Sequence, residues 1–166
     1  MHARLNDYDL NVTMRLDEYL INKKTIALNQ TASHWKDAVR VAVQLLENAG
    51  SVTSEYYNAI LDNHEKNGPY YVIVPSVAMP HAAPDKGVCT LGFSLVTLKT
   101  PVVFGHPDHD PVEIVLCIAS PDRKSLNEEM ITQVMELLDN DETIPRLRAA
   151  QTLDDVANLF HDIFLS

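Results

Sequence analysis

The stretch that decides the fold is "GPYYVIVPSVAMPHAAPDKG", Gly68 to Gly87. Its run of aromatic and β-branched residues, Tyr70 to Val74, is bounded by turn residues and predicts a buried strand. Pro75 and Pro80 keep the next segment extended, because proline fixes its own φ and disfavours helical backbone in the residue before it. The chain therefore carries His81 on a rigid extended platform, directly before the polar turn "AAPDKG".

His81 has two interpretations from these residues. An imidazole at the end of a sheet lies where pockets form in α/β folds, which makes it a candidate functional residue. A histidine whose nitrogens are satisfied inside the protein could equally end a core strand. The neighbouring residues alone leave both interpretations open, and the structural one is the simpler.

Periodicity on either side of this stretch predicts a layered α/β domain. Apolar residues at helical spacing predict helices over 33–50, 53–68, 125–141, 144–149 and 152–164. Alternating or continuous apolar runs predict strands over 25–28, 70–74, 90–98, 102–104 and 112–119. Helices before and after a central block of strands are typical of a three-layer α/β/α sandwich, in which helices flank a mixed central sheet.

The same periodic pattern predicts which residues cap the helices and where a charged residue lies in its strand. Ser33 is expected to cap the first of these helices. Ser125 with Glu128, and Thr152 with Asp155, have the spacing of capping boxes. Glu113 lies inside a strongly apolar run, so we expect it at the start of its strand, where the carboxylate can reach water.

The 166 residues match one domain that is large enough to bury a core without disulfides or metals. Residues 1–13, "MHARLNDYDLNVT", are polar and lack periodicity. We expect them to form an N-terminal arm outside the fold: a disordered leader, an upstream start or a cloning addition. The domain itself is expected over 14–166.

Composition and charge exclude several classes of function. No signal peptide is visible, and no apolar run approaches the ~18 residues of a membrane span, so we expect a cytoplasmic protein. The net charge of −10 argues against binding to nucleic acid or to an anionic membrane surface. An acidic surface suits a basic protein partner, or it serves solubility alone. Cys89 and Cys117 are predicted to be buried, reduced core residues.

Motifs for other chemistries are absent or weak. The five glycines form neither a GxGxxG nor a GxxxxGK[ST] loop, and the sequence contains no GxSxG, HExxH or paired CxxC motif. His34, His64 and His161 are interpreted as surface or half-buried helix residues. The segment "GHPDHDP", 105–111, offers a possible zinc or manganese site, but its composition is also that of an ordinary turn, which we favour. Its candidate ligands are His106, Asp108, His109 and Asp110.

The segment "NGPYYVIVPSVAMPHA", Asn67 to Ala82, resembles the active-site signature of the mannitol–fructose class of enzyme IIA proteins of the phosphoenolpyruvate-dependent sugar phosphotransferase system. The centre of that signature is Ala78-Met79-Pro80-His81-Ala82. Further stretches are similar to the ascorbate-specific and cryptic-mannitol branch, so that the resemblance extends from Met14 to the C-terminus. They are "MRLDEYL", "WKDAVRVAVQLL", "YYNAILDNHEKNGPYY" and "LGFSLVTLKTPVVF".

This resemblance implies a phosphotransferase for sugar uptake, in which His81 is the transient phosphohistidine. The phosphoryl group would come from the histidine of the phosphocarrier protein HPr, which commonly presents a basic surface, and would pass to a cysteine of enzyme IIB. Enzyme IIB would serve the membrane component, enzyme IIC. No metal, nucleotide or other cofactor is implied. Imidazole suits the task because near neutral pH one ring nitrogen can attack while the other keeps its proton.

The sequence departs from the family pattern at two positions. Leu126 occupies the place of a second histidine near the active one, and Ala83 replaces an arginine that is usual in the close branch. Leucine cannot donate a hydrogen bond to a phosphoryl oxygen. Candidates that could compensate lie near the same predicted helix N-terminus or in the turn after His81; they are Ser125, Asn127, Lys86 and, further away, Arg123 and Lys124.

Three functions therefore remain. The leading hypothesis is a phosphoryl-carrying enzyme IIA. The alternative is a regulatory enzyme IIA-like module that transfers weakly or not at all and binds partners through the same face. A metal-dependent hydrolase that uses His106, Asp108 and His109 is the third.

Overall fold

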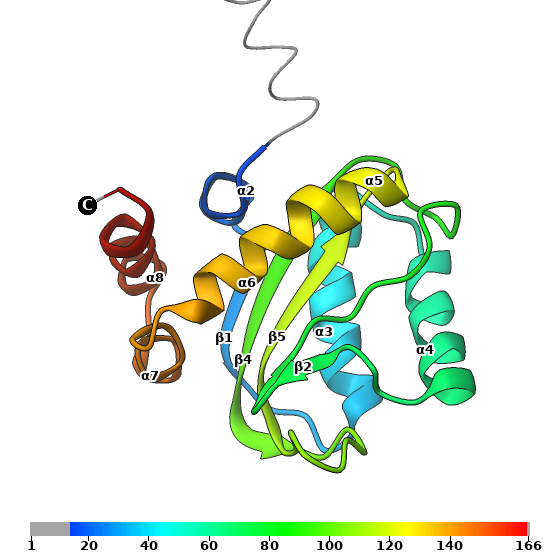
Figure 1. Cartoon of the computed structure of the whole chain (residues 1–166), viewed down its shortest axis with the longest axis horizontal. Coiled ribbons are helices and arrows are strands. Elements are labelled where there is room, and N and C mark those ends of the chain that lie inside the picture. The colour runs from blue at the N-terminus through cyan, green and yellow to red at the C-terminus, as the bar shows by residue number, and fades with distance from the viewer. Residues whose placement is uncertain (1–13, 166) are drawn as a thin grey trace, which may run out of the picture.

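The computed structural model describes residues 14–165 (Figure 1). The expected arm, residues 1–13, lies outside this range. The strands are β1 (Ile26–Gln30), β2 (Val72–Val74), β3 (Val77–Ala78), β4 (Gly92–Val102) and β5 (Val112–Ala119). The helices are α2 (Leu16–Lys23), α3 (Trp35–Asn48), α4 (Glu55–Asn67), α5 (Arg123–Ser125), α6 (Ile131–Asp139), α7 (Thr143–Ala149) and α8 (Leu153–Phe160). Two π-helical turns, η1 (Leu126–Met130) and η2 (His161–Leu165), extend α5 and α8.

The five strands form one mixed sheet in the order β1-β4-β5-β3-β2. β1 runs parallel to β4, and β3 runs parallel to β5, while the β4–β5 and β2–β3 pairs are antiparallel. The short β3 therefore lies beside the long β5. The mixed sheet predicted from the sequence is confirmed.

Helices cover both faces of this sheet, because alternate residues of β4 contact different helices. Ser94 donates a hydrogen bond from Oγ to the Ala42 carbonyl of α3 over 2.8 Å. The preceding residue, Phe93, points to the opposite face and meets the Tyr19 ring of α2, with the ring centroids 6.1 Å apart. Figure 1 shows α6 crossing the sheet on the face opposite α3. The three-layer sandwich is therefore confirmed.

The sheet is the centre of the hydrophobic core. Residues of β5 are buried along the strand except for Glu113, which is half-buried. Both carboxylate oxygens of Glu113 accept hydrogen bonds from Arg148, over 2.8 and 2.7 Å. The ion pair lowers the Glu113 pKa, so the carboxylate stays charged at the start of the strand, as predicted. Within residues 14–165, every helix is too short or too polar to cross a lipid bilayer.

The predicted strands 90–98 and 102–104 are replaced by one continuous strand, β4, which ends at Val102, so that Val103 and Phe104 lie outside it. Lys99, Thr100 and Pro101 are exposed, and the pairing with β5 shifts register between Thr97 and Val102. This irregularity accommodates a proline that cannot donate to the ladder. The separation into two strands was therefore wrong, because Pro101 marks a bulge and not a break.

Two helix starts also differ from the prediction. The helix expected at Ser125 begins at Arg123, because the Asp122 carboxylate accepts the backbone N–H of Ser125 over 2.7 Å. The Ser125–Glu128 capping box was therefore wrong. His34, not Ser33, caps α3, since its Nδ1 accepts the Lys36 N–H. The capping box that begins α8 at Thr152 is confirmed.

The two cysteine predictions have different outcomes, and one helix was missed. Cys117 is buried and unpaired, as predicted, but Cys89 is exposed in the connection before β4 and not part of a strand. The helix α2 was not predicted. Its apolar residues Leu16, Tyr19 and Leu20 are buried, but so is Asp17, which weakens the periodic pattern that sequence analysis depends on.

The connection between β3 and β4 is pinned to the start of α4. The Thr53 N–H donates to the Gly87 carbonyl over 2.8 Å, and Val52 forms an isolated bridge with Val88. Gly87 has φ +94°, and a Cβ at this position would lie 2.5 Å from the Thr53 Oγ1. Only glycine fits here, because both the backbone conformation and the space exclude a side chain.

We predict that Gly87→Ala lowers the free energy of unfolding by at least about 2 kcal/mol, since left-handed backbone and a steric clash are combined. Gly50→Ala is the matched control: Gly50 has φ +81°, and a Cβ added there would meet no atom within 4 Å apart from those of its neighbours in the chain. It should cost only about 1 kcal/mol. Urea unfolding of both variants measures the difference, and equal losses would contradict the role assigned to the Thr53 contact.

Candidate functional site

His81 follows β3 on a backbone that is held from two sides. The Met79 N–H donates to the Tyr71 carbonyl over 2.8 Å, and the Ile118 N–H donates to the Pro80 carbonyl over 3.1 Å. The first bond joins the extended segment before His81 to the residue that precedes β2, and the second joins it to β5. The extended conformation that Pro75 and Pro80 predict is therefore fixed by the sheet on both sides.

The residue after His81 is held by a buried tyrosine of α4. The Tyr56 hydroxyl accepts the Ala82 N–H over 3.0 Å and donates to the Ile118 carbonyl over 2.5 Å. Burial raises the Tyr56 pKa well above its ordinary value, so the hydroxyl keeps the proton that it donates. One side chain thus connects the helix, the sheet and the backbone beside His81.

The orientation of the His81 ring defines which nitrogen can react. Its Nδ1 lies 2.8 Å from the Met79 carbonyl oxygen, which can only accept. Nδ1 must therefore carry the proton, and in the neutral ring Nε2 holds the free electron pair. Burial lowers the His81 pKa, and the bond to Met79 opposes this shift. The result is an imidazole that stays neutral and nucleophilic below its ordinary pKa of 6.5.

Tyr70 packs against His81 from the segment before β2. The two ring centroids are 5.9 Å apart and the ring planes are nearly perpendicular, at 85°. The Asn63 side chain of α4 donates to the Tyr70 hydroxyl over 2.6 Å. Although the ring is fixed at both ends, Tyr70 is 46% exposed.

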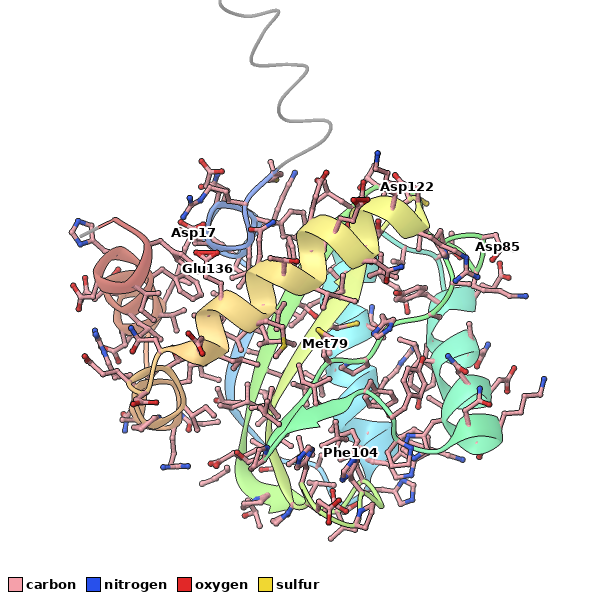
Figure 2. All side chains as sticks on the ribbon, viewed as in Figure 1. Asp17, Met79, Asp85, Phe104, Asp122 and Glu136 are labelled. Atoms are coloured by element: carbon pink, nitrogen blue, oxygen red, sulfur yellow. The ribbon has the colours of Figure 1, made fainter. Side chains whose placement is uncertain are left out.

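His81 lines a cleft of about 650 Å³ between α4 and the start of α5 and η1. Figure 2 shows Asp85, in the turn after His81, and Asp122, before α5, at the same end of the molecule. The α4 wall is polar, and the opposite wall combines a cation, an apolar side chain and an amide. The lining residues other than His81 are Glu55, Asn58, Ala59, Asp62, Asn63, Lys66, Tyr70, Ala82, Ala83, Lys86, Arg123, Leu126 and Asn127.

Three cations from separate elements line this cleft. Lys66 lies in the last turn of α4, Lys86 lies in the turn after His81, and Arg123 begins α5. The ion pairs among residues 14–165 include none of them. Their positive charge is therefore available to an anion in the cleft, next to the acidic side chains Glu55 and Asp62.

The structure brings most of the predicted phosphate neighbours to one place. Lys86, Leu126 and Asn127 line the same cleft as His81, and so does Arg123. Ser125 is not among the lining residues: its hydroxyl donates to the Asp122 carboxylate over 3.2 Å. Lys124 does not line the cleft either.

Leu126, where the resemblance led us to expect a second histidine, is apolar and buried. Leu126 is only 6% exposed, and its carbonyl accepts the N–H of Ile131 five residues later, which defines the π-helical turn. Ala83 lines the cleft as well and brings no charge. Neither position supplies a hydrogen-bond donor side chain.

Sequence reasoning missed the α4 wall of the site. Glu55, Asp62 and Lys66 recur at helical spacing on a side of α4 away from its buried residues. This polar stripe was visible in the sequence. However, a solvated helix face has the same pattern, so only the position of α4 next to His81 identifies it as a wall.

Of the three remaining helix histidines, one was predicted wrongly. His64 is buried, not a surface or half-buried residue, because it stacks on Trp35 with the ring centroids 3.6 Å apart. Its Nδ1 lies 2.5 Å from the Tyr71 hydroxyl, and burial lowers its pKa. His34 and His161 are exposed, as predicted.

The metal alternative at 105–111 has no support in the described part of the chain. No group of three or more potential ligands in residues 14–165 could hold a metal ion. His106 Nδ1 accepts backbone N–H groups, and the stacked His109 lies with Nδ1 2.9 Å from the Val72 carbonyl. The Asp110 carboxylate accepts three backbone N–H groups, those of Phe104, Gly105 and His106. The segment is a turn whose polar side chains are used in hydrogen bonds to the backbone.

Residues 19–163 match the family described as "Phosphoenolpyruvate-dependent sugar phosphotransferase system, EIIA 2". The chain is 44% identical over 146 residues to the ascorbate-specific PTS system EIIA component of Shigella flexneri, in an alignment that covers 88% of this chain and 95% of the relative. The fold is similar to that of the mannitol-specific cryptic phosphotransferase enzyme IIA CmtB from Escherichia coli, with a TM-score of 0.78, 30% identity and coverage of 90% and 99%.

A second solved structure includes a partner. The chain is similar to a chain in the complex of enzyme IIAMtl and phosphorylated enzyme IIBMtl from Escherichia coli. The TM-score is 0.73 and the identity 27%, with 84% of this chain and 95% of that chain covered.

The hydrogen bond to Met79 generates a prediction about the His81 ring. In ¹⁵N-labelled protein, long-range ¹H–¹⁵N spectra should show Nδ1 protonated and Nε2 free in the neutral ring, and a titration midpoint below 6.5. Because the pKa is lowered, the nucleophilic neutral form persists below pH 6.5 and is lost only as the pH falls through the lower midpoint. An Nε2–H tautomer, or a midpoint above 6.5, would contradict the assigned geometry.

Proposed function

Since this chain belongs to the EIIA 2 family of the phosphoenolpyruvate-dependent sugar phosphotransferase system, we propose that His81 is its transient phosphohistidine. The observation that carries this proposal is the hydrogen bond from Nδ1 to the Met79 carbonyl. It leaves the electron pair of Nε2 free on a ring that lines an accessible cleft with three cations.

The reaction is a transfer of one phosphoryl group in two steps. The Nε2 electron pair attacks the phosphorus of a donor phosphohistidine, and the donor N–P bond breaks with its electron pair returning to the donor ring. Nδ1 keeps its proton, so the phosphorylated ring is cationic and its hydrogen bond to the Met79 carbonyl is strengthened. In the second step an acceptor thiolate attacks phosphorus, and the N–P electron pair returns to Nε2 of His81.

The cleft supplies charge stabilisation to this transfer. Phosphoryl transfer passes through a loose transition state with charge on the peripheral oxygens, so positioning and electrostatics matter more than bond-making by the protein. Lys66, Lys86 and Arg123 line the space that these oxygens would occupy. They would take over the part that a second histidine plays in related proteins, with Asn127 as a further donor.

The partners follow from the relatives. The mannitol complex pairs an enzyme IIA with phosphorylated enzyme IIB, which supports enzyme IIB as the acceptor here. HPr is the proposed donor, and the acidic side chains Glu55 and Asp62 on the cleft wall suit a basic partner surface. The higher identity to the ascorbate-specific relative, 44% against 30% for the cryptic mannitol enzyme, favours an ascorbate-specific system over a mannitol system. The proposal also includes enzyme IIC as the membrane component and the cytoplasm as the location.

Phosphorylation of His81 is tested with labelled phosphoenolpyruvate, enzyme I and HPr. The wild-type chain is expected to take up one acid-labile phosphoryl group and to release it to enzyme IIB of the ascorbate system. His81→Ala should take up none, while His161→Ala, which changes an exposed histidine that does not line the cleft, should be labelled normally. Equal labelling of the wild type and His81→Ala would refute the proposal.

A regulatory module is the second candidate, and the buried Leu126 favours it. A chain without the second histidine donor could accept phosphate slowly and bind partners according to its phosphorylation state. The same labelling experiment separates the two functions. Label that reaches His81 but is not passed to any enzyme IIB, even at high concentration, would support regulation over transport.

We predict that the cleft cations accelerate transfer. Lys66→Met, Lys86→Met and Arg123→Met should each slow phosphorylation by HPr on the order of tenfold, because each removes charge next to the developing oxyanions. Lys124→Met is the matched control, since Lys124 is adjacent to Arg123 in sequence but does not line the cleft. Its rate should stay within about twofold of wild type. Stopped-flow or quenched transfer assays measure the rates, and equal effects of Arg123→Met and Lys124→Met would contradict the assignment.

A further inference from the structure

The aromatic ring beside the reactive imidazole is an unusual feature of the cleft. Large side chains exposed to solvent are ordinarily free to change rotamer, but Tyr70 is 46% exposed and still held at both ends. The Asn67 side chain donates to Asn63 over 2.6 Å, and Asn63 donates to the Tyr70 hydroxyl over 2.6 Å. The Tyr70 ring also meets the ring of buried Tyr71 edge to face, with the centroids 5.7 Å apart.

These contacts hold the Tyr70 ring against the His81 ring. A surface tyrosine needs none of them, since its hydroxyl can bind water and its ring can lie on the protein surface in several ways. The chain of amides from α4 instead sets the ring in one orientation, perpendicular to the imidazole. The arrangement fixes a group that lies next to the imidazole of His81.

We propose that Tyr70 is a positioning residue, which holds the His81 imidazole in its reactive orientation and shields the phosphohistidine from water. The second half of this proposal rests on the proposed function of His81, whereas the first half does not. Tyr70 is assigned no bond to the phosphoryl group and takes no part in the transfer itself.

The two contacts of His81 restrain different motions. The bond from Nδ1 to the Met79 carbonyl fixes the direction of one nitrogen, but the ring can still rock about that bond. The perpendicular Tyr70 ring limits this rocking, because it already contacts the imidazole and blocks a tilt toward the tyrosine. With both contacts present, Nε2 keeps one direction within the cleft. This is the requirement for in-line transfer between two proteins.

The same contact affects the lifetime of the phosphorylated state. Hydrolysis needs a water molecule whose oxygen attacks phosphorus while the N–P electron pair returns to Nε2. A carrier must disfavour this reaction until the acceptor arrives. A fixed aromatic ring on one side of the imidazole reduces the directions from which water can approach.

The experiment compares Tyr70→Leu with two other variants. Tyr70→Phe keeps the ring and loses only the bond to Asn63. Tyr57→Leu is the matched control, because Tyr57 is a partly buried α4 tyrosine that contacts Lys36 and Arg40 and does not line the cleft. Two quantities are measured on each protein: the tautomer ratio of His81 at about pH 8, where the ring is neutral, by ¹⁵N NMR, and the hydrolysis rate of the isolated phosphoprotein.

Tyr70→Leu is expected to raise the minor tautomer and the hydrolysis rate by about two- to tenfold, the range that the loss of one aromatic pair implies. Tyr70→Phe should fall between Tyr70→Leu and wild type, and Tyr57→Leu should match wild type. Circular dichroism checks folding, and Tyr70→Met is measured instead if Tyr70→Leu does not fold.

The outcomes separate the two proposals. An unchanged tautomer ratio together with an unchanged hydrolysis rate in Tyr70→Leu would overturn the role of Tyr70, even if His81 is phosphorylated normally. Failure of wild-type His81 to accept phosphate would instead overturn the proposed function. The tautomer ratio would then still decide whether Tyr70 positions the ring.

Discussion

The hydrogen bond between Nδ1 of His81 and the Met79 carbonyl is the interaction on which the site depends. The two residues are close in sequence, but the bond can orient the ring only because the Met79 backbone is itself held in place. Tyr71, directly before β2, holds that backbone on one side, and Ile118 of β5 holds it through Pro80 on the other. Tyr56 then fixes the backbone after the histidine to α4. The nitrogen that we propose to react is thus oriented by the core of the protein and not by its surface.

Much of this fold could be predicted because its signals are strong and local. The β-branched run before Pro75 and the apolar run of β5 indicate their strands directly, and the amphipathic patterns of α3 and α8 indicate those helices. The resemblance carried by the residues around His81 is confirmed by the family match. These elements share one property: their sequence pattern has a single physical explanation.

The rest could not be predicted because the sequence offers competing explanations. Asp122 and Ser125 are both good helix caps three residues apart, and only the structure shows which one is used. Pro101 is compatible with a strand end or with a bulge. In the site, the polar stripe of α4 is indistinguishable from a solvated face until α4 is placed next to His81. Cys89 lies near apolar residues but outside any strand.

The helix end that contains the π-helical turn η1 directs some side chains to the cleft and others to the hydrophobic core. One additional residue in this turn shifts the angular phase of the helix by about 100° and leaves its periodicity unchanged. Met130 and Val134 stay within the interior while Arg123 and Asn127 face the cleft. Substitutions of the exposed Arg123 and Asn127 are therefore expected to leave the packing beneath α6 unchanged, whereas Leu126 belongs both to the cleft and to the core. During evolution, the charge at this helix end could therefore change to suit new partners while the buried residues of α6 stay the same.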